Sequence, residues 1–305
     1  MQHSAHLLMI QPVRFEYNTQ TAVNNSFQTA TDARGNEVQQ KAQQEFDAFI
    51  ELLRAHDIDV TVVKDTAIPH TPDSVFPNNW ISFHDPGIIC LYPMFAPNRR
   101  QERKQTVLDA IAAKFRVQEQ IDFTWHEAGN RFLEGTGSMV LDRDHKIAYA
   151  CLSPRTDLTV LQDFCSRMGY TPVAFHSADA GGQPIYHTNV MMCVADAYAI
   201  ICMEAIPDPA EQTRVKESLR QTGKTLIEIS MDQLNHFAGN MLQVHNRKGE
   251  KMLVMSSQAY RSLTTGQLNA IEQFNPLLHS DITTIETNGG GSARCMMAEI
   301  FLPLK

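Results

Sequence analysis

The chain has 305 residues, and its 43% hydrophobic and 20% charged content is typical of a folded globular protein rather than a disordered one. Its formal net charge of −8, without a long basic run, argues against a nucleic-acid-binding surface. No segment approaches the roughly 18 apolar residues of a membrane span, and residues 1–14 do not resemble a signal peptide. Six cysteines without CxxC spacing favour reduced thiols, so we expect a cytoplasmic protein with neither a nucleic-acid nor a membrane partner.

In chain order, the first predicted elements are a strand at Leu7–Gln11, a helix at Glu37–Ala55 and a strand at Ile58–Val63. After them, a hairpin of two short apolar runs followed by a helix occurs four times, and in the last three copies a further strand follows the helix. These copies lie at Trp80–Phe83, Ile88–Tyr92 and Glu102–Phe115; Ser138–Leu141, Lys146–Cys151, Leu158–Met168 and Pro172–Phe175; Val190–Val194, Tyr198–Met203, Pro209–Gln221 and Thr225–Ile229; and Met241–His245, Met252–Met255, Ser257–Phe274 and Ile282–Glu286.

The two ends of the chain are expected to complete a fifth unit. The last predicted strand, Cys295–Leu302, would pair with Leu7–Gln11. Repetition of one unit predicts a radial α/β repeat rather than a Rossmann alternation, with a generic α/β domain as the alternative. No linker or low-complexity segment interrupts the sequence, so residues 1–305 are expected to form a single domain.

A glycine-rich segment, Asn288–Ser292, stands shortly before Cys295. Three consecutive glycines lose much backbone entropy on folding, so they are expected where a chain bends tightly or passes close to a ligand. Cys295 would then lie at the rim of this loop and start a buried strand. An ordinary buried cysteine is the alternative, because most free cysteines are inert core residues.

Two further polar residues, His187 and Glu134, stand just before predicted strands. Taken singly, each is more often a structural histidine or a solvated acid. In a radial repeat, however, equivalent strand starts converge on the axis, so Cys295, His187 and Glu134 are expected to meet in one pocket. A cysteine, a histidine and a carboxylate are the groups that a nucleophilic carbon–nitrogen hydrolase needs.

The ending Gly-Gly-Gly-x-x-x-Cys, the His-x-Asn segment at His187 and the Leu-Glu-Gly-x-Gly segment around Glu134 resemble the guanidine-modifying (pentein) superfamily. This superfamily includes arginine deiminase, dimethylarginine dimethylaminohydrolase, succinylarginine dihydrolase and the amidinotransferases. The resemblance runs from Thr71 to Glu299 and is closest to the dimethylaminohydrolase-like branch, which includes citrulline-utilisation hydrolases. It implies a five-bladed pseudo-symmetric α/β propeller with Cys295 as nucleophile, His187 as proton-transfer partner and Glu134 orienting substrate nitrogen. It implies no metal and no organic cofactor.

The resemblance also implies a binding site for the α-amino and α-carboxylate groups of an amino acid. In the Pro-Asp-Ser-Val-Phe segment, Asp73 matches the family's ligand for the substrate α-amino group. In the Ser-x-Arg-Thr segment, Arg155 matches the residue that binds the α-carboxylate. The Ala-Pro-Asn-Arg-Arg stretch is similar to a mobile loop with another substrate arginine, which would be either Arg99 or Arg100.

The sequence departs from the dimethylaminohydrolases at Asn78 and Asn79, where they carry an acidic pair. An amide presents a donor and an acceptor without a charge, so a cationic guanidinium should bind less well here than a neutral ureido group. Asn189, where deiminases carry an aspartate, is a second neutral replacement. Succinylarginine dihydrolase, which resembles this chain in having an asparagine at this point, nevertheless acts on a guanidine.

Together these residues predict a hydrolase that forms a covalent intermediate on Cys295 and converts citrulline to ornithine, carbon dioxide and ammonia. Three alternatives stay open: a deiminase-type hydrolase of arginine or methylarginine, an amidinotransferase, and a non-catalytic ligand-binding propeller. The expected partner is a small amino-acid substrate, and the sequence indicates neither the oligomeric state nor the pathway.

Overall fold

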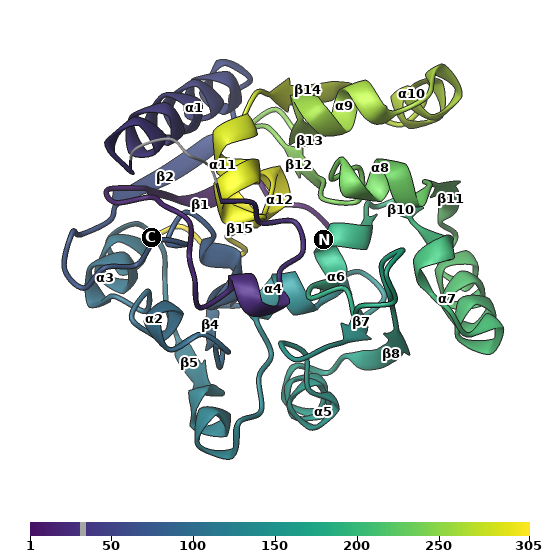
Figure 1. Cartoon of the computed structure of the whole chain (residues 1–305), viewed down its shortest axis with the longest axis horizontal. Coiled ribbons are helices and arrows are strands. Elements are labelled where there is room, and N and C mark those ends of the chain that lie inside the picture. Colours follow the sequence, from purple (N-terminus) through teal and green to yellow (C-terminus); the bar gives the residue numbers. More distant parts are fainter. Residues whose placement is uncertain (31–34) are drawn as a thin grey trace.

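The structure is a computed structural model that describes residues 1–30 and 35–305. The described residues form five three-stranded sheets, and in each sheet the middle strand pairs antiparallel with one neighbour and parallel with the other. Figure 1 shows these sheets spread around the centre of the molecule, with the long helices on the outside. A parallel pair needs a long crossover connection, and here each crossover contains a helix.

Four of the five units follow one another along the chain in the predicted order. Their elements are β3 (Ile81–His84), β4 (Ile88–Leu91), α3 (Gln105–Lys114) and β5 (Glu119–Asp122); β6 (Val140–Asp142), β7 (Ile147–Leu152), α5 (Leu158–Met168) and β8 (Thr171–His176); β9 (Met192–Val194), β10 (Tyr198–Ile201), α7 (Pro209–Gln221) and β11 (Thr225–Glu228); and β12 (Leu242–His245), β13 (Lys251–Ser256), α9 (Ser257–Ser262), α10 (Thr265–Glu272) and β14 (Leu277–Ser280).

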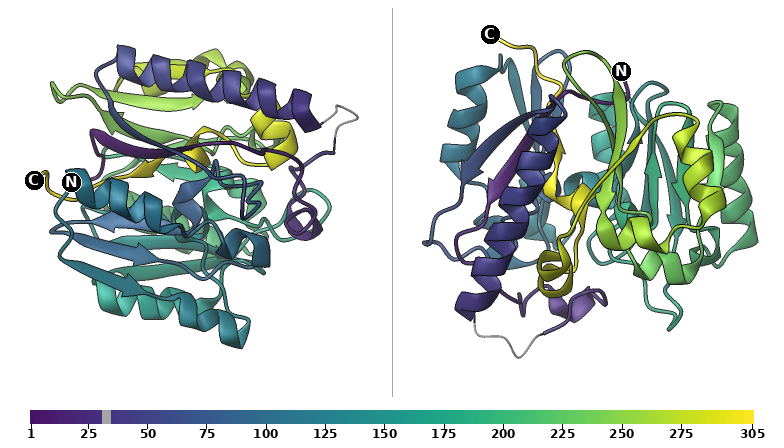
Figure 2. Two further views of the ribbon diagram at one scale, coloured as in Figure 1. Left: turned by 90° about the vertical axis from the view of Figure 1, so that its left-hand side faces the viewer. Right: turned by 90° about the horizontal axis from the view of Figure 1, so that it is seen from above.

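The fifth unit is assembled from both ends of the chain. Strand β15 (Ala298–Glu299) pairs antiparallel with β1 (His6–Gln11), which pairs in parallel with β2 (Asp59–Lys64). Helix α1 (Gly35–Ala55) connects β1 to β2 and runs along the outer side of their sheet (Figure 2). The predicted closure of a fifth unit by the chain ends is therefore confirmed. That the units form a closed five-bladed propeller stays a prediction.

Capping residues define the two helices whose bounds agree with the prediction at both ends. The carboxylate of Asp157 accepts hydrogen bonds from the first backbone N–H groups of α5, and Gly169 ends that helix at a φ of 70°. Asp208 caps α7 in the same way, and Pro209 is its first residue. Both helices could be predicted because their capping residues bond to backbone groups only two or three residues away.

Two predictions in the fourth unit are wrong. The single helix expected at Ser257–Phe274 is divided into α9 and α10, because the hydroxyl of Thr264 caps a new helix in a capping box with Gln267. The strand expected at Ile282–Glu286 lies instead on helix α11 (Thr283–Gly289) and the residue before it. Ile282 and Ile285 are three residues apart and pack in the same apolar cluster, whereas β14, which ends two residues before Ile282, pairs with β13.

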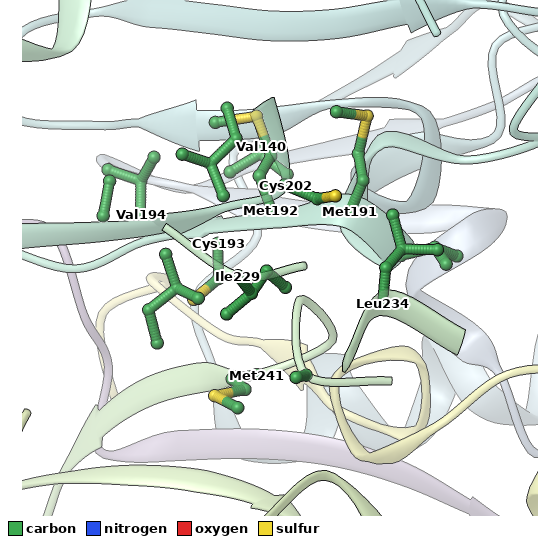
Figure 3. Packing of buried hydrophobic residues seen from close by; sticks show 14 of the residues in the cluster. Val140, Met191, Met192, Cys193, Val194, Cys202, Ile229, Leu234 and Met241 are labelled. Carbon is green, nitrogen blue, oxygen red and sulfur yellow. The ribbon is translucent and has the colours of Figure 1, made fainter. Parts of the chain in front are cut away.

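The largest apolar cluster lies where the second, third and fourth of these consecutive units meet. In Figure 3, Val140, Met192, Ile229 and Met241 bring side chains from different units into this cluster. All six cysteines, each in the described part of the chain, are buried and free, as predicted. Within the same described ranges, no helix is long and apolar enough to cross a membrane.

Candidate active site

In three of the sheets, a short helix stands just before the strand that pairs antiparallel with the middle strand. Helix α4 (Gly135–Ser138) precedes β6, α6 (Thr188–Met191) precedes β9, and α12 (Ala293–Met296) precedes β15; all three lie near the middle of Figure 1. The predicted strand starts at Ser138, Val190 and Cys295 are therefore wrong. One turn of helix is too short to leave a periodic pattern in the sequence, so these segments were read as parts of the strands.

These helices bring together the three residues that the sequence singled out. Glu134 and His187 are the residues that directly precede α4 and α6, and Cys295 lies within α12. Nε2 of His187 is 2.8 Å from Oε2 of Glu134, and Nδ2 of Asn189 on α6 is 3.4 Å from Sγ of Cys295. His187 and Glu134 thus contact each other, and Cys295 contacts the residue two positions after His187. That the three form one catalytic pocket stays a prediction.

The pKa values of His187 and Glu134 are both well below their ordinary values. Burial raises the pKa of Glu134, but Arg155, His187 and Arg99 outweigh it and lower that pKa to about 2. Burial lowers the pKa of His187 to about 4, because the opposing effect of Glu134 is smaller. Glu134 therefore raises the pKa of His187, but not enough to keep the imidazole protonated near pH 7. An ionised carboxylate can only accept hydrogen bonds, so Nε2 of His187 carries the proton and Nδ1 is free.

The sulfur of Cys295 has two amide neighbours. Cys295 is 2% exposed, and its Sγ lies 3.4 Å from Nδ2 of Asn189 and 3.3 Å from Nδ2 of Asn240. Amide N–H groups favour the anionic form of an acceptor that is removed from water. This environment suits a cysteine that becomes a thiolate during a reaction.

Arg99, rather than Arg100, points toward these residues. It lies on the one-turn helix α2 (Pro97–Arg100), where a mobile loop was expected, and its side chain is buried. Its Nε and Nη2 bind the carboxylate of Glu102 at 2.8 and 3.0 Å, and its Nη1 donates to Oδ1 of Asn79 at 2.7 Å. Arg100 binds the backbone carbonyls of residues 94 and 95 instead. Burial raises the pKa of Glu102 to about 7, against the lowering effect of Arg99.

Asn78 and Asn79 form a short 3₁₀ helix, η2 (Pro77–Asn79), before β3. Nδ2 of Asn79 donates to Oδ1 of Asn78 at 3.0 Å. A Cβ at Gly137 would lie 2.5 Å from this Nδ2 and 2.7 Å from Nδ1 of His187. Glycine at this position therefore lets the amide of Asn79 and the free nitrogen of His187 come close to each other.

Asp73 lies against the N-terminal segment. Its Oδ2 accepts hydrogen bonds from Nδ2 of Asn18 at 2.8 Å and from the hydroxyl of Thr21 at 3.1 Å. Its Oδ1 is buried and has no hydrogen-bond partner among the described residues. Burial raises the pKa of Asp73, and Arg99 opposes this effect. Asp73 therefore has one carboxylate oxygen left to accept from a ligand.

Arg155 is also held by the N-terminal segment. Its Nε donates to Oδ1 of Asn24 at 2.8 Å, and its Nη2 donates to the backbone oxygen of Thr21 at 2.9 Å. The guanidinium lies 4.8 Å above the ring of Tyr186, and Nη1 is 3.6 Å from Oε2 of Glu134. Oδ1 of Asn24 thus sits in the fork of Arg155 that would bind a carboxylate.

The glycine-rich loop passes closely over neighbouring side chains, as its composition predicted. Gly290 has a φ of 64°, and a Cβ there would lie 2.5 Å from Nδ2 of Asn25. A Cβ at Gly291 would lie 3.1 Å from the ring of Phe76 and 3.4 Å from Cβ of Cys295. The absence of these Cβ atoms allows the loop to close over Cys295.

Several residues at the site were missed by sequence reasoning. Asn240 lies two residues before β12, and its place near the start of the fourth unit was its available signal. Glu102 lies three residues after Arg99, a spacing that brings two side chains together on a helical turn. Asn18, Thr21 and Asn24 lie in a segment without periodicity, and nothing local connects them to Asp73 or Arg155. No group of three or more His, Cys, Asp and Glu residues in the described ranges could hold a metal ion.

This geometry belongs to a known class of protein. The profile of a family described as "N,N dimethylarginine dimethylhydrolase, eukaryotic" matches residues 11–302, and the chain belongs to that family. It is therefore a member of the guanidine-modifying superfamily, as predicted. A search of curated proteins found no match.

Solved structures with the same fold include cyanobacterial proteins. ArgZ, an arginine dihydrolase from the ornithine–ammonia cycle, superimposes with a TM-score of 0.74 at 15% identity, over 98% of this chain and 41% of that one. The N-terminal domain of ArgZ, covalently bound to a reaction intermediate, gives 0.72 at 16% identity and 98% coverage of both chains. A dimethylarginine dimethylaminohydrolase adduct with S-methyl-L-thiocitrulline gives 0.64 at 14% identity, over 98% of this chain and 99% of that one. The chain thus spans less than half of full-length ArgZ, and at these identities the likeness establishes the shared fold.

Proposed function

We propose that this protein is a cysteine hydrolase of a ureido or guanidino amino acid, with citrulline as its favoured substrate and ornithine as its product. The observation that carries the proposal is the convergence of helices α4, α6 and α12, through the contact of the neutral His187 with the ionised Glu134 and that of Asn189 with Cys295. A five-bladed propeller accounts for this convergence, because equivalent strand starts then face one axis. Family membership supports the chemistry, and the choice of citrulline rests on the residues that would contact the substrate.

The reaction begins with transfer of the Cys295 thiol proton to Nδ1 of His187 while Sγ forms a bond with the ureido carbon. The carbon–nitrogen bond to the ornithine side chain then breaks, and the imidazolium of His187 protonates the departing nitrogen. A water molecule attacks the resulting carbamoyl thioester, and His187 takes up its proton. The sulfur–carbon bond breaks, the thiol recovers its proton, and the released carbamate decomposes to carbon dioxide and ammonia.

The head group of the substrate is bound by Asp73 and Arg155. The unpartnered Oδ1 of Asp73 accepts an N–H of the α-ammonium group. The α-carboxylate takes the place of Oδ1 of Asn24 in the fork of Arg155. Both contacts lie within the group of side chains around Glu134, since Nη1 of Arg155 is 3.6 Å from that carboxylate.

The far end of the substrate meets Asn79. A guanidinium donates hydrogen bonds and cannot accept them, so Arg99 requires the oxygen of the Asn79 amide and leaves Nδ2 turned toward His187. Nδ2 is a donor, and the ureido group of citrulline has a carbonyl oxygen that accepts, whereas the guanidinium of arginine has none. Asn189 likewise presents Nδ2 toward Cys295.

Arginine is the second candidate, and the fold of the arginine dihydrolase ArgZ favours it. In that case the ionised Glu134 would hold the cationic guanidinium alone, since Asn78, Asn79 and Asn189 carry no charge. An amidinotransferase would use the same nucleophile and pass the one-carbon unit to an amine instead of water.

Incubation of the purified protein with citrulline, arginine and dimethylarginine tests the proposal when ornithine, citrulline and ammonia are assayed together. We expect ornithine and ammonia from citrulline, and no turnover by Cys295→Ser, because a serine hydroxyl is far less acidic than a thiol. If ornithine forms from arginine with a much higher kcat/KM than from citrulline, arginine rather than citrulline is the favoured substrate. Turnover that depends on an added amine would indicate a transferase, and full activity of Cys295→Ser would refute the cysteine mechanism.

A further inference from the structure

Asn240 lies at the one hairpin start not used in the mechanism above. It lies two residues before β12, whose pairing with β13 begins at Leu242, and its side chain is fully buried. Its Nδ2 lies 3.3 Å from Sγ of Cys295 and donates to the backbone oxygen of Asn189 at 2.8 Å. The next residue, Met241, points into the apolar core (Figure 3), which fixes the chain on either side of the amide.

The backbone before Asn240 is shaped to hold this side chain. Phe237 has a φ of 58°, a left-handed conformation that is costly for a bulky residue, and its carbonyl accepts from the N–H of Asn240 at 2.8 Å. A Cβ at Gly239 would lie 2.4 Å from the backbone oxygen of Val190 on α6. Strained residues of this kind persist where the surrounding structure enforces them, and they cluster at functional sites.

The amide of Asn240 is only half satisfied. Its Oδ1 is buried and has no hydrogen-bond partner within the described residues. A buried carbonyl oxygen without a hydrogen-bond donor destabilises the folded state, so its presence indicates that a ligand supplies the donor. The nitrogen of the same amide contacts the sulfur, which places the unpaired oxygen beside the reacting centre. A ureido or guanidino group attacked by Cys295 would present N–H donors there.

We propose that Asn240 is a further catalytic residue, whose Nδ2 supports the anionic sulfur of Cys295 and whose Oδ1 accepts an N–H from the planar ureido or guanidino group. The assignment rests on the proposed function, because it assumes that Cys295 is the nucleophile. Asn240 itself neither gains nor loses a proton. Together with Asn189 it supplies two N–H groups to the buried sulfur, and such groups favour its anionic form.

The pH dependence of Cys295 alkylation tests the first half of this assignment without substrate. Iodoacetamide labelling of Cys295, followed by mass spectrometry from pH 5 to 10, gives the pH at which labelling reaches half its maximal rate. We expect Asn240→Ala to raise this midpoint by about one to two pH units, the worth of one hydrogen bond to a charged group. Asn240→Asp, which keeps the shape and adds a negative charge, should raise it further.

Asn275→Ala is the matched control, since Asn275 is also a buried asparagine but bonds to Tyr198 and Gln243, away from the sulfur. It should lower the melting temperature and leave the midpoint unchanged. Unchanged midpoints in Asn240→Ala and Asn240→Asp would overturn the proposal, and Asn240→Asp preserves the test if the alanine variant does not fold.

Turnover tests the second half. Asn240→Ala should lower kcat/KM by about 100-fold for the best substrate, as loss of one preorganised hydrogen-bonding group does. Normal turnover in a folded Asn240→Ala protein would refute the role of Oδ1. Full activity of Cys295→Ser would instead refute the proposed function, and the alkylation profiles would still report whether Asn240 supports the sulfur. The two failures are therefore distinguishable.

Discussion

Nη1 of Arg99 donates a 2.7 Å hydrogen bond to Oδ1 of Asn79, and this bond determines which side of the Asn79 amide faces His187. Arg99 is itself fixed by its two bonds to Glu102. In the proposed function, the choice between a neutral and a cationic substrate therefore depends on three residues rather than on Asn79 alone. An acid placed at position 79 would meet Arg99 as well as the substrate.

Asn79→Asp should shift preference from citrulline toward arginine. The new carboxylate adds a negative charge close to His187, where a guanidinium would lie, but Arg99 neutralises part of it. We expect the ratio of kcat/KM for arginine to that for citrulline to rise by about tenfold, equivalent to about 1.4 kcal/mol. Asn130→Asp is the control, because it adds the same charge at an exposed residue. Equal ratios in Asn79→Asp and wild type would contradict this account of specificity.

His187→Ala should reduce kcat by about 100- to 10,000-fold, the usual effect of removing a positioned acid or base. The wild-type pH profile provides an independent check. His187 must be neutral to accept a proton, and its pKa is about 4, so the acid limb of kcat/KM should lie near pH 4 rather than near 6.5. Glu134→Gln removes a group that raises the pKa of His187, so the limb should move to lower pH. An acid limb near 6.5 would show that His187 is not the base.

The repeated unit was predictable because its signals are local. Turn residues divide each hairpin, and Asp157 and Gly169 define the ends of α5 through contacts within a few residues. The short helices around Glu134 and His187 were not predictable, because four residues carry no helical period.

The candidate site was predictable only in part. Cys295 stands out through its glycine loop, and the motifs around it point to the family. Asn240 has no distinctive neighbours, and its contact with Sγ appears only when the fourth unit is placed against the fifth, where Cys295 precedes β15. The same holds for Asn24, whose contact with Arg155 joins residues 131 positions apart.

Asp73→Asn should impair binding more than chemistry. The unpartnered Oδ1 of Asp73 is proposed to receive the α-ammonium group, and loss of one partner of a buried charge pair costs about 2 kcal/mol or more. We expect KM for citrulline to rise by about 30-fold or more, with a smaller change in kcat. For 5-ureidopentanoate, which lacks the α-amino group, wild type and variant should have similar kcat/KM. An equal loss with both substrates would place Asp73 outside the head-group site.

Glu286→Gln should change how stability depends on pH. Glu286 is buried on α11, and Ser292, the residue before α12, donates to its Oε1 at 2.6 Å. Burial raises the pKa of Glu286 to about 7, against the lowering effect of hydrogen bonds from Ser256 and Ser292. In the unfolded chain its pKa is 4.5, so between pH 4.5 and 7 the folded state binds the extra proton. Its contribution to stability is complete below pH 4.5 and is lost as the pH rises through 7.

Glutamine keeps the acceptor for Ser292 and removes the ionisation, so the Glu286→Gln variant should not share this loss. Urea unfolding at pH 4.5, 6 and 8 measures the difference in unfolding free energy between variant and wild type at each pH. That difference should move in favour of the variant by up to about 3 kcal/mol from pH 4.5 to 8. The exposed Glu51→Gln on α1 is the control and should show no such trend. Parallel curves for Glu286→Gln and wild type would mean that Glu286 is ionised in the folded protein at pH 4.5 to 7, and that Ser292 is bound by a carboxylate throughout.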